Sequence, residues 1–318
     1  MTLLATPAPR PKLPPLCVFQ RAMEFGRGVF MMGVVNITPD SFSDGGHFLE
    51  HSSAIEHGLS LWEAGADILD IGGESTRPGA DPVSVSEEIA RVVPVIKALS
   101  CRCDAWISVD TYKAEVARAA VDAGAHLVND ISGLGFDDEM ASTVADLECG
   151  LILMHIRKTP KTMQRDISYD DLIGEISSYF KTRIRQAVDA GVEPSRIILD
   201  PGIGFGKTRA QNYQLLRELA TFTDHGHPLL IGTSRKSFIG AVVNRPATER
   251  VWGTAATVAC GIFAGADIVR VHDVQEMSDV VRVSEAICAF PQTDNAQDGA
   301  TQDPLGEQNS TVDEAERI

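Results

Sequence analysis

The chain has 318 residues and a formal net charge of −16, because acidic side chains outnumber lysine and arginine. An acidic chain of this kind is not expected to bind nucleic acid or an anionic membrane surface, since both require clustered basic residues. Hydrophobic residues make up 44% of the sequence, enough for a large core, and the length accommodates one barrel of about 250 residues. The six cysteines fit neither a disulfide framework nor a four-ligand zinc pattern, so we expect reduced thiols in a cytoplasmic protein.

The two ends of the sequence differ in composition from its centre. The opening stretch, MTLLATPAPRPKLPPLC, is too interrupted by proline to form the apolar part of a secretion signal, and we expect a Pro-rich disordered leader over residues 1–15. Residues 291–318 are acidic and nearly without aliphatic side chains, which predicts a disordered tail. The apolar stretch 251–269 is rich in Ala and Gly and contains Asp267, so it favours a packed helix over a membrane span. The folded domain is expected over residues 16–290.

Between these tails, short β-branched runs alternate with segments of helical periodicity. Apolar residues three and four positions apart, such as Ile55, Leu59 and Trp62, indicate amphipathic helices. Near-continuous apolar strands separated by helices are typical of a parallel sheet, and eight such units fit a closed (β/α)8 TIM barrel of the α/β class. The predicted strands cover residues 30–35, 67–71, 106–109, 126–129, 151–154, 196–199, 228–232 and 267–271.

Three segments of the sequence share one layout. They read EAGADILDIG at 63–72, DAGAHLVND at 122–130 and FAGADIVRVHD at 263–273. In each, a helix is predicted to end at a glycine suited to the left-handed conformation, and a strand follows within a few residues. This internal similarity supports a barrel over the main alternative, a doubly wound open sheet, which strand number alone does not exclude.

Each predicted strand is followed by polar residues. In barrels the functional groups gather at the C-terminal ends of the strands. A single polar residue at such a position is usually a cap, but polar residues at every strand end are difficult to explain in that way. The positions are Asn36, Gly72 to Arg77, Asp110, Asn129 with Asp130, His155, Asp200, Ser234 to Ser237, and Arg270 with His272.

These residues form two chemical sets. The first set could bind the edge of a flat heteroaromatic ring, where a carboxylate accepts two N–H bonds from an aminopyrimidine, or its carboxylates could pair with a lysine across the barrel. The second set suits a phosphate or pyrophosphate, which gains from forked arginine contacts and can carry Mg²⁺ held by few protein oxygens. The first set is Asp110, Asn129, Asp200 and Lys236, and the second is Arg77, Arg270, His272 and the amide of Asn36.

The segment from Asp200 to Lys207 reads DPGIGFGK and has glycines at alternate positions. This spacing fits neither the dinucleotide fingerprint nor the phosphate loop. We expect a flat ligand to approach the backbone here, with Phe205 as an apolar wall. No serine lies in a nucleophile elbow, and Cys149 and Cys260 have no evident base, so covalent catalysis is not expected.

Together these motifs resemble the dihydropteroate synthases, pterin-binding enzymes of folate biosynthesis. The resemblance covers about residues 30–289, and it is specific because eight motifs occur in the order found in the family. The motifs are MGVVNITPDSFSDGG at 32–46, DIGGESTRPGA at 70–80, ISVDT at 107–111, VNDISG at 128–133, MHIRKTPKTMQ at 154–164, DPGIGFGK at 200–207, GTSRKSFIG at 232–240 and IVRVHD at 268–273.

The resemblance implies a reaction that joins 6-hydroxymethyl-7,8-dihydropterin pyrophosphate to 4-aminobenzoate, giving 7,8-dihydropteroate and pyrophosphate. It implies Mg²⁺ as the cofactor and a dissociative path, in which pyrophosphate leaves first and the aniline nitrogen then attacks a cationic pterin. Related enzymes are sulfonamide targets and are usually dimers. A homodimer is therefore expected, with the Ala-rich helix after Val251 and the last helix as candidate interface elements.

The resemblance also assigns roles to individual residues of this sequence. The pterin would be bound by Asp110, Asn129, Ile131, Met154, Asp200, Phe205 and Lys236. The pyrophosphate would be bound by Asn36, Thr76, Arg77, Arg270 and His272, with Asn36 also the Mg²⁺ ligand. The 4-aminobenzoate would lie against Phe42, Thr76, Pro78, Phe205, Lys236 and Ser237. The implied catalytic residues are Asn36, Asp44, Lys236, Arg270 and His272, and Asp44 would stabilise the cation or accept the aniline proton.

Two other functions fit a pterin-binding barrel less well. A barrel that transfers a methyl group from methyltetrahydrofolate to a corrinoid protein has no need for the STRPGA loop or for both Arg270 and His272. A catalytically silent relative would be expected to lack a charged strand-end residue, and none is missing here. The departures from the family pattern are Ile156 and Lys158 in the loop after the fifth strand, where the family more often has a sulfur or amide side chain and a glycine.

Overall fold

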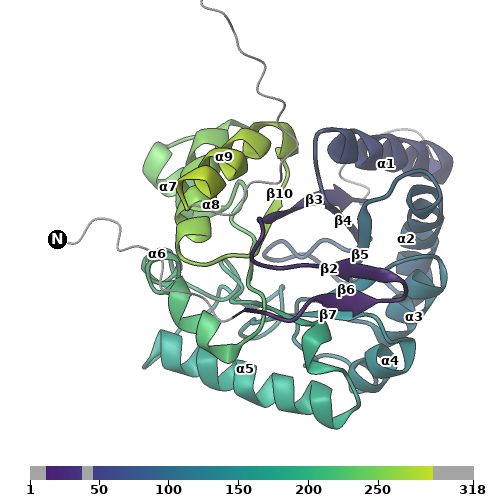
Figure 1. The fold of residues 1–318 in the computed structure, drawn as a ribbon, viewed down its shortest axis with the longest axis horizontal. Helices are drawn as coiled ribbons and strands as arrows, with labels where there is room; N and C mark the ends of the chain where they lie inside the picture. Colours follow the sequence, from purple (N-terminus) through teal and green to yellow (C-terminus); the bar gives the residue numbers. More distant parts are fainter. Residues whose placement is uncertain (1–11, 38–45, 289–318) are drawn as a thin grey trace, which may run out of the picture.

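A computed structural model describes residues 12–37 and 46–288 of the chain. Strands and helices alternate along these residues, and the helices surround the strands (Figure 1). The predicted leader and acidic tail lie largely outside the described residues. The parts of the molecule that position the site are the strands, the loops that follow them and the polar residues inside the barrel.

Eight parallel strands form one sheet in the order β8-β7-β6-β5-β4-β3-β10-β9. The two edge strands meet through a parallel bridge between Leu199 and Leu229, which closes the barrel and excludes the open-sheet alternative. Each predicted strand is confirmed to within about two residues at its ends, as expected for strongly apolar runs. The strands are β3 (Phe30–Asn36), β4 (Ile68–Gly72), β5 (Trp106–Asp110), β6 (Leu127–Asp130), β7 (Gly150–Met154), β8 (Ile197–Asp200), β9 (Leu230–Ile231) and β10 (Ile268–Val271).

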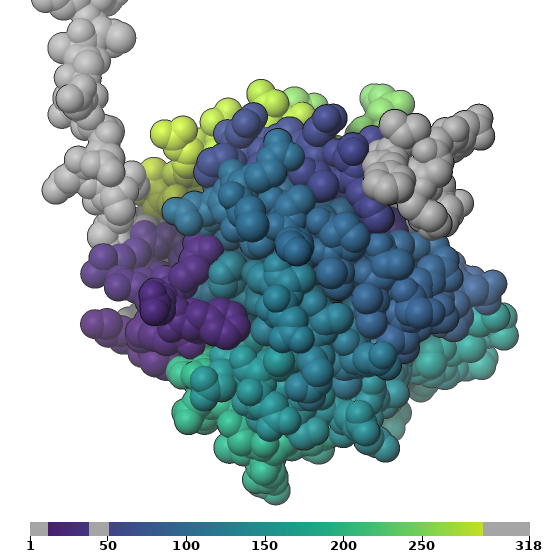
Figure 2. All heavy atoms as spheres, turned by 90° about the vertical axis from the view of Figure 1, so that its right-hand side faces the viewer, coloured from purple at the N-terminus to yellow at the C-terminus, as the bar shows by residue number. Residues whose placement is uncertain are grey.

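The helices cover the outside of the barrel, and Figure 2 shows the continuous surface formed on one side by α1 to α4. Side chains of Ser84 and Asp171 cap the first turns of α2 and α5, and Thr208 and Gln211 form a reciprocal capping box at α6. The α-helices are α1 (Gly46–Glu63), α2 (Val85–Ser100), α3 (Ala114–Asp122), α4 (Met140–Leu147), α5 (Leu172–Asp189), α6 (Arg209–Arg217), α7 (Ser237–Val243), α8 (Val251–Phe263) and α9 (Val274–Ile287). The shorter 3-10 helices are η2 (Pro194–Arg196), η3 (Leu219–His225) and η4 (Ala247–Glu249).

The repeated AGA layout has the geometry that its sequence predicts. Gly65, Gly124 and Gly265 follow α1, α3 and α8, and their φ angles of +102°, +115° and +109° lie in the region that favours glycine. Each strand then begins within three residues of its glycine. The three segments are therefore equivalent helix-to-strand connections of the barrel.

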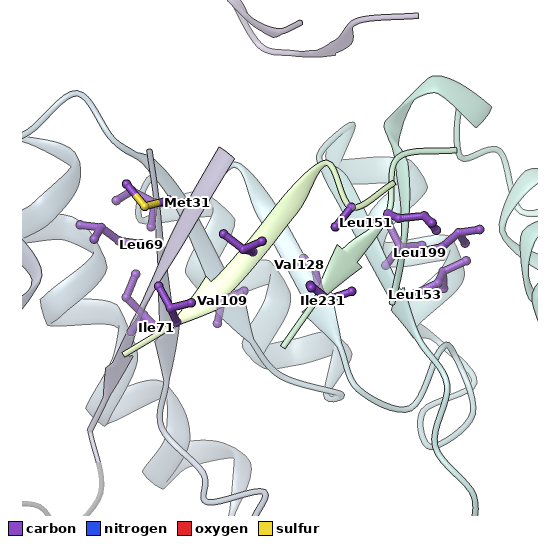
Figure 3. Close-up of a cluster of buried hydrophobic side chains, with 14 of the residues drawn as sticks. Met31, Leu69, Ile71, Val109, Val128, Leu151, Leu153, Leu199 and Ile231 are labelled. Carbon is purple, nitrogen blue, oxygen red and sulfur yellow. The ribbon is translucent and has the colours of Figure 1, made fainter. Parts of the chain in front are cut away.

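Alternate residues of each strand belong to two separate hydrophobic layers. Side chains facing the helices form the larger cluster, and Figure 3 labels members of it on strands from β3 to β9. The other residues point into the barrel, where Met32, Ile68, Trp106 and Ile268 belong to a smaller cluster near the N-terminal ends of the strands. The barrel is thus closed at one end by packed apolar side chains.

A short antiparallel hairpin, β1 (Leu16–Val18) and β2 (Arg21–Met23), covers this apolar end (Figure 1). The hairpin was not predicted, because three-residue strands are too short to show a periodic pattern. β1 begins at Leu16, the first residue of the expected folded domain. Leu16 is fully buried against the inner cluster, so its burial stabilises the strand. Among the described helices, none is long and apolar enough to cross a membrane, and the stretch 251–269 forms α8, a turn and the first residues of β10.

Candidate active site

The inward-facing residues change from apolar to polar as the strands approach their C-terminal ends, which we call the barrel mouth. On β4, Ile68 belongs to the inner apolar cluster and Asp70 is the next residue on the same face. On β10, Ile268 is followed in the same way by Arg270. A polar layer therefore lies directly above the apolar end of the barrel interior.

Arg270 crosses the mouth and joins two carboxylates from other strands. Its Nε donates to Oδ2 of Asp70 at 2.6 Å, and its Nη2 donates to Oδ2 of Asp110 at 2.9 Å. Only β3 lies between β10 and β4 in the sheet, while β3 and β4 both lie between β10 and β5. The side chain therefore reaches past one strand to Asp70 and past two strands to Asp110. Both bonds are charge-assisted and together fix the plane of the guanidinium. The predicted pterin and pyrophosphate sets therefore meet at Arg270.

Asp110 is held in an environment that favours its protonated form. Burial raises its pKa to about 7, the positive charge of Arg270 opposes this shift, and the nearby charge of Asp70 adds to it. Within the described residues, Oδ1 of Asp110 and Oδ1 of Asp70 are buried without a hydrogen-bond partner. A buried acceptor of this kind costs about 1–3 kcal/mol when it stays unpaired. The Asp110 oxygen is suited to accept an N–H group of a ligand.

An apolar wall stands beside these polar groups at the mouth. Ile131 and Met154, both predicted to contact the pterin, lie in one cluster with Phe205. Ile156, one of the departures from the family pattern, is buried in the same cluster. Lys158, the other departure, has φ +66°, which explains why the family more often has a glycine there. The remaining members of the cluster are Met163 and Tyr112.

Asp200 and Lys236 interact electrostatically on another side of the barrel mouth. Burial raises the pKa of Asp200, and the nearby positive charge of Lys236 opposes that shift. Burial lowers the pKa of Lys236 to about 8, with the charge of Asp200 acting in the other direction. The Lys236 ammonium also lies 4.5 Å from the ring centre of Phe205 and donates to the carbonyl of Ile203. These contacts bring Lys236 beside Phe205 and the loop that follows Asp200.

The alternate glycines of the DPGIGFGK segment allow its backbone to fold closely against the preceding loop. A Cβ at Gly202 would lie 1.9 Å from the carbonyl oxygen of His155, and φ at Gly202 is +67°. Lys207 is 3% exposed, and its Nζ donates to the carbonyls of Gly202 and Phe205, both at 2.9 Å. These glycines serve contacts within the protein. Contacts within the protein therefore account for these glycines without the close approach of a ligand to the backbone that we expected.

His272 lies beside the serine that begins the SRKS motif. Its Nδ1 is 2.9 Å from Oγ of Ser234, and its backbone N–H donates to the same oxygen. Burial lowers the pKa of His272 to about 4, and the charges of Arg270, Arg235 and Arg77 add to this effect. The ring is therefore neutral at pH 7. Arg77 itself is exposed, so its charge reaches His272 from the surface of the mouth.

A buried ion network holds the loop that carries Thr76, Arg77 and Pro78. The Lys113 ammonium lies 2.6 Å from Oε2 of Glu74 and 2.5 Å from Oε2 of Glu88. The Tyr112 hydroxyl donates to the other oxygen of Glu74 at 2.6 Å. Glu74 begins the loop, so the network fixes the end of the loop nearest the barrel.

Some predicted residues are placed without a contact that defines their role. Thr76 is half-buried, and Pro78 and Ser237 are exposed, with Ser237 at the first position of α7. Phe42 and Asp44 lie outside the described residues, so their predicted roles stay predictions.

Asn36 is exposed at the end of β3 and pairs in register with Gly72. A Cβ at Gly72 would lie 3.8 Å from Oδ1 of Asn36 and 3.6 Å from Cβ of Asp110, so the glycine leaves space between these two side chains. The described residues contain no group of three or more His, Cys, Asp or Glu that could hold a metal ion. Mg²⁺ commonly uses one or two protein oxygens and completes its shell with water and phosphate. The amide oxygen of Asn36 fits a metal held in that way.

Three residues of the mouth were missed by sequence reasoning. Asp70 was missed because it lies within an apolar run instead of at its end. Glu74 lies in the DIGGESTRPGA motif and Lys207 in the DPGIGFGK motif, but the sequence does not indicate which residues they contact. Two predicted strand-end groups hold loops next to their own strands: Asp130 accepts from Ser132 and Leu134, and His155 contacts Lys207.

Comparison with known proteins agrees with this geometry. The family described as pterin binding enzyme matches residues 32–272. Dihydropteroate synthase from Synechocystis is 50% identical over 275 residues, which are 86% of this chain and 95% of that protein. The crystal structure of the Clostridium difficile enzyme in the presence of pteroic acid has 45% identity and a TM-score of 0.79, covering 83% of this chain and 98% of that one. The Xanthomonas albilineans enzyme with 4-aminobenzoic acid has 43% identity and a TM-score of 0.81, covering 88% and 100%.

A match over most of the chain, together with the ligand groups gathered at one barrel mouth, places this chain in the family of pterin-binding enzymes, among the dihydropteroate synthases.

Proposed function

We propose that the barrel mouth joins 6-hydroxymethyl-7,8-dihydropterin pyrophosphate to 4-aminobenzoate and releases 7,8-dihydropteroate and pyrophosphate. The observation that carries this proposal is the contact of Arg270 with Asp110, because it brings an anion-binding group beside an acceptor for heterocycle N–H groups. The Clostridium structure was determined in the presence of pteroic acid and the Xanthomonas structure with 4-aminobenzoic acid, and both compounds share chemical parts with the proposed product.

The pterin would lie on the polar layer with its ring against the apolar wall. Oδ1 of Asp110 is a buried acceptor without a partner among the described residues, and Asp200 offers a second carboxylate. An aminopyrimidine edge presents adjacent N–H groups that match such acceptors. Ile131 and Met154 would contact the ring from the side, since both are buried in the apolar cluster.

The pyrophosphate would lie toward β10 and β3, where the basic groups gather. Arg270 is anchored by two of its nitrogens and can offer the rest of its guanidinium to phosphate oxygens. The neutral ring of His272 can donate from Nε2, because Nδ1 faces Ser234. Arg77 and Thr76 would add contacts from the exposed loop.

The kinds of side chain at the barrel mouth support a dissociative reaction. The bond from the exocyclic carbon to the pyrophosphate oxygen would break with its electron pair on pyrophosphate, leaving a cationic pterin. The aniline nitrogen of 4-aminobenzoate would then form the carbon–nitrogen bond and lose a proton. Carboxylates fixed around the pterin would stabilise the cation, because they are oriented before the charge develops. Whether Asp44 accepts the proton stays a prediction.

Asn36 would hold Mg²⁺ together with the pyrophosphate and water. Bound there, the ion would add positive charge beside the leaving oxygens. The protein residues would still orient the pyrophosphate, because Arg270 lies on β10, next to β3, and His272 follows that strand.

The 4-aminobenzoate would enter beside Phe205 and Lys236. The ammonium of Lys236 lies over the face of Phe205, and the exposed Ser237 follows it at the start of α7. A carboxylate at this position would be attracted by the positive charge of Lys236. Thr76, Pro78 and Phe42 are proposed to cover the ring.

We also propose that two copies of the chain associate through α7, α8 and α9. Val242 is 71% exposed and Trp252 is 79% exposed, although both are large apolar side chains. Val283 and Ile287 on α9 are exposed as well. α8 and α9 lie side by side, so these residues can form one apolar surface (Figure 1).

The direct test mixes the purified protein with the pterin pyrophosphate, 4-aminobenzoate and Mg²⁺ and measures 7,8-dihydropteroate. Product that depends on both substrates supports the proposal. No product from a folded protein that still binds the pterin would favour the silent relative. Methyl transfer from methyltetrahydrofolate to a corrinoid protein would favour the other alternative.

A further inference from the structure

Asp70 is a fully buried acid of the barrel mouth and lies inside β4, two residues before the strand ends. Its side chain is 0% exposed. Its Oδ2 accepts from Nε of Arg270 at 2.6 Å and from Nδ2 of Asn129 at 3.1 Å. Asp70 thus connects a residue of the pyrophosphate set with a residue of the pterin set.

We propose that Asp70 is a positioning residue for pterin transfer, which orients Arg270 and Asn129 for the substrate. This inference rests on the proposed function. Asp70 acts on the reaction through these two side chains and not through a contact with the reacting atoms.

The partners of Asp70 distinguish it from an acid that only stabilises the fold. Asp130 is equally buried, but its carboxylate accepts from Ser132 and Leu134 in its own loop. Asp70 instead bonds to two side chains from other strands, and both are assigned to substrates. A buried carboxylate is costly unless it is paired, so its position here needs a partner of opposite charge.

The shared contact also explains how one arginine keeps a fixed orientation. Asp110 takes Nη2 of Arg270 while Asp70 takes Nε, so two bonds at different nitrogens fix the guanidinium plane. With Asp110 alone, the guanidinium could rotate about the remaining bond. We therefore expect the loss of the Asp70 charge to affect the pterin pyrophosphate and not the 4-aminobenzoate.

The test compares Asp70→Asn with Ser108→Ala in the purified full-length chain. Ser108 pairs in register with Asp70 on β5, and its buried hydroxyl has no partner among the described residues, so its removal alters the same layer without touching Arg270. For Asp70→Asn we expect kcat/KM for the pterin pyrophosphate to fall about 10- to 100-fold, as for a lost charge-assisted bond. KM for 4-aminobenzoate at saturating pterin pyrophosphate should stay within about twofold, since Asp70 does not contact Phe205 or Lys236. Ser108→Ala should retain the wild-type values.

A double-mutant cycle with Arg270→Gln tests whether Asp70 acts through Arg270. We expect Asp70→Asn to have little further effect in the Arg270→Gln background. Independent, multiplying effects would overturn the proposal, as would a kcat/KM for the pterin pyrophosphate within about threefold of wild type in Asp70→Asn. If Asp70→Asn does not unfold cooperatively, Asp70→Ser replaces it in the same cycle. Absence of dihydropteroate with the wild-type protein would instead count against the proposed function.

Discussion

The buried ammonium of Lys207 donates a hydrogen bond to Nδ1 of His155 at a distance of 2.9 Å. Burial lowers the pKa of His155 well below its ordinary value, so the ring is neutral and can accept this bond. The same ammonium donates to the carbonyls of Gly202 and Phe205. Burial lowers the pKa of Lys207 well below its ordinary value, and this one side chain connects the loop after β7 with the glycine loop that carries Phe205.

Replacing Lys207 by Met should lower the free energy of unfolding by about 3 kcal/mol, because buried acceptors lose their donor. KM for 4-aminobenzoate should rise as well, since Phe205 loses the support of its backbone. Urea denaturation and steady-state kinetics measure the two effects. Lys181→Met, which changes an exposed lysine on α5, is the matched control and should alter stability by less than about 0.5 kcal/mol. Equal stability of Lys207→Met and wild type would contradict this account.

The pH dependence of kcat/KM for the pterin pyrophosphate should be bell-shaped. Asp110 must be a carboxylate to accept N–H bonds, and its pKa is raised to about 7, so activity should fall about tenfold per pH unit below that value. Lys236 must be an ammonium, and its pKa is lowered to about 8, so activity should also fall above that value. Asp70→Asn should move the acid limb to lower pH, because the Asp70 charge raises the pKa of Asp110. A value of kcat/KM that stays constant between about pH 6 and pH 9, a range that spans both pKa values, would refute these assignments.

Binding of pyrophosphate should depend on both Mg²⁺ and Arg270. In calorimetric titrations with Mg²⁺, Arg270→Ala should weaken binding by about tenfold or more, since a forked charge-assisted contact is lost. Chelation of Mg²⁺ with EDTA should also weaken binding to the wild type. Arg245→Ala is the control, because Arg245 is an exposed arginine paired only with Glu249 among the described salt bridges. Equal heats for wild type and Arg270→Ala would argue against the proposed anion site.

Asp200→Asn should abolish detectable pterin binding while the protein still unfolds cooperatively. Asp200 is 5% exposed, and its Oδ1 accepts from the backbone N–H of Gly202 at 2.7 Å, a bond that asparagine can keep. The lost charge matters because the carboxylate would accept N–H groups of the pterin. Fluorescence titration with a pterin and thermal melting test the two statements, with the exposed Asp146→Asn as the control. Unchanged pterin affinity would remove Asp200 from the site.

The strand ends could be predicted because near-continuous apolar runs stop abruptly at polar residues. Asn36, Asp110 and Asp200 are the last residues of their strands. Asp70 could not be predicted in the same way, because it lies inside an apolar run. A polar residue there is informative only when the inward-facing register of β4 is known, and that register depends on pairing with β3 and β5.

The contacts between loops could not be predicted from the sequence. Lys207 and His155 are 52 residues apart and meet only when β7 and β8 pair. The ion network of Glu74, Lys113 and Glu88 likewise joins three separate segments. Such pairs leave no periodic pattern, so motifs indicate that these residues belong to the site without indicating their partners.

The exposed apolar surface of α7 to α9 predicts that Trp252→Glu converts the proposed dimer to a monomer. Trp252 is 79% exposed, and a large aromatic side chain at the centre of an interface commonly contributes about 2 kcal/mol or more to association. Burying a glutamate there without a partner would add a further cost, so the dimer dissociation constant should rise by about 100-fold or more.

Sedimentation velocity over a range of protein concentrations measures this change. Phe19→Glu is the matched control, because Phe19 is an aromatic residue that is 60% exposed in the turn between β1 and β2. That hairpin covers the opposite end of the barrel from the mouth, away from the proposed interface (Figure 1). The control should sediment as the wild type does. If Trp252→Glu also sediments as the wild type does, the exposed apolar surface is not where two copies meet, because an unpaired charge buried in the interface would weaken their association.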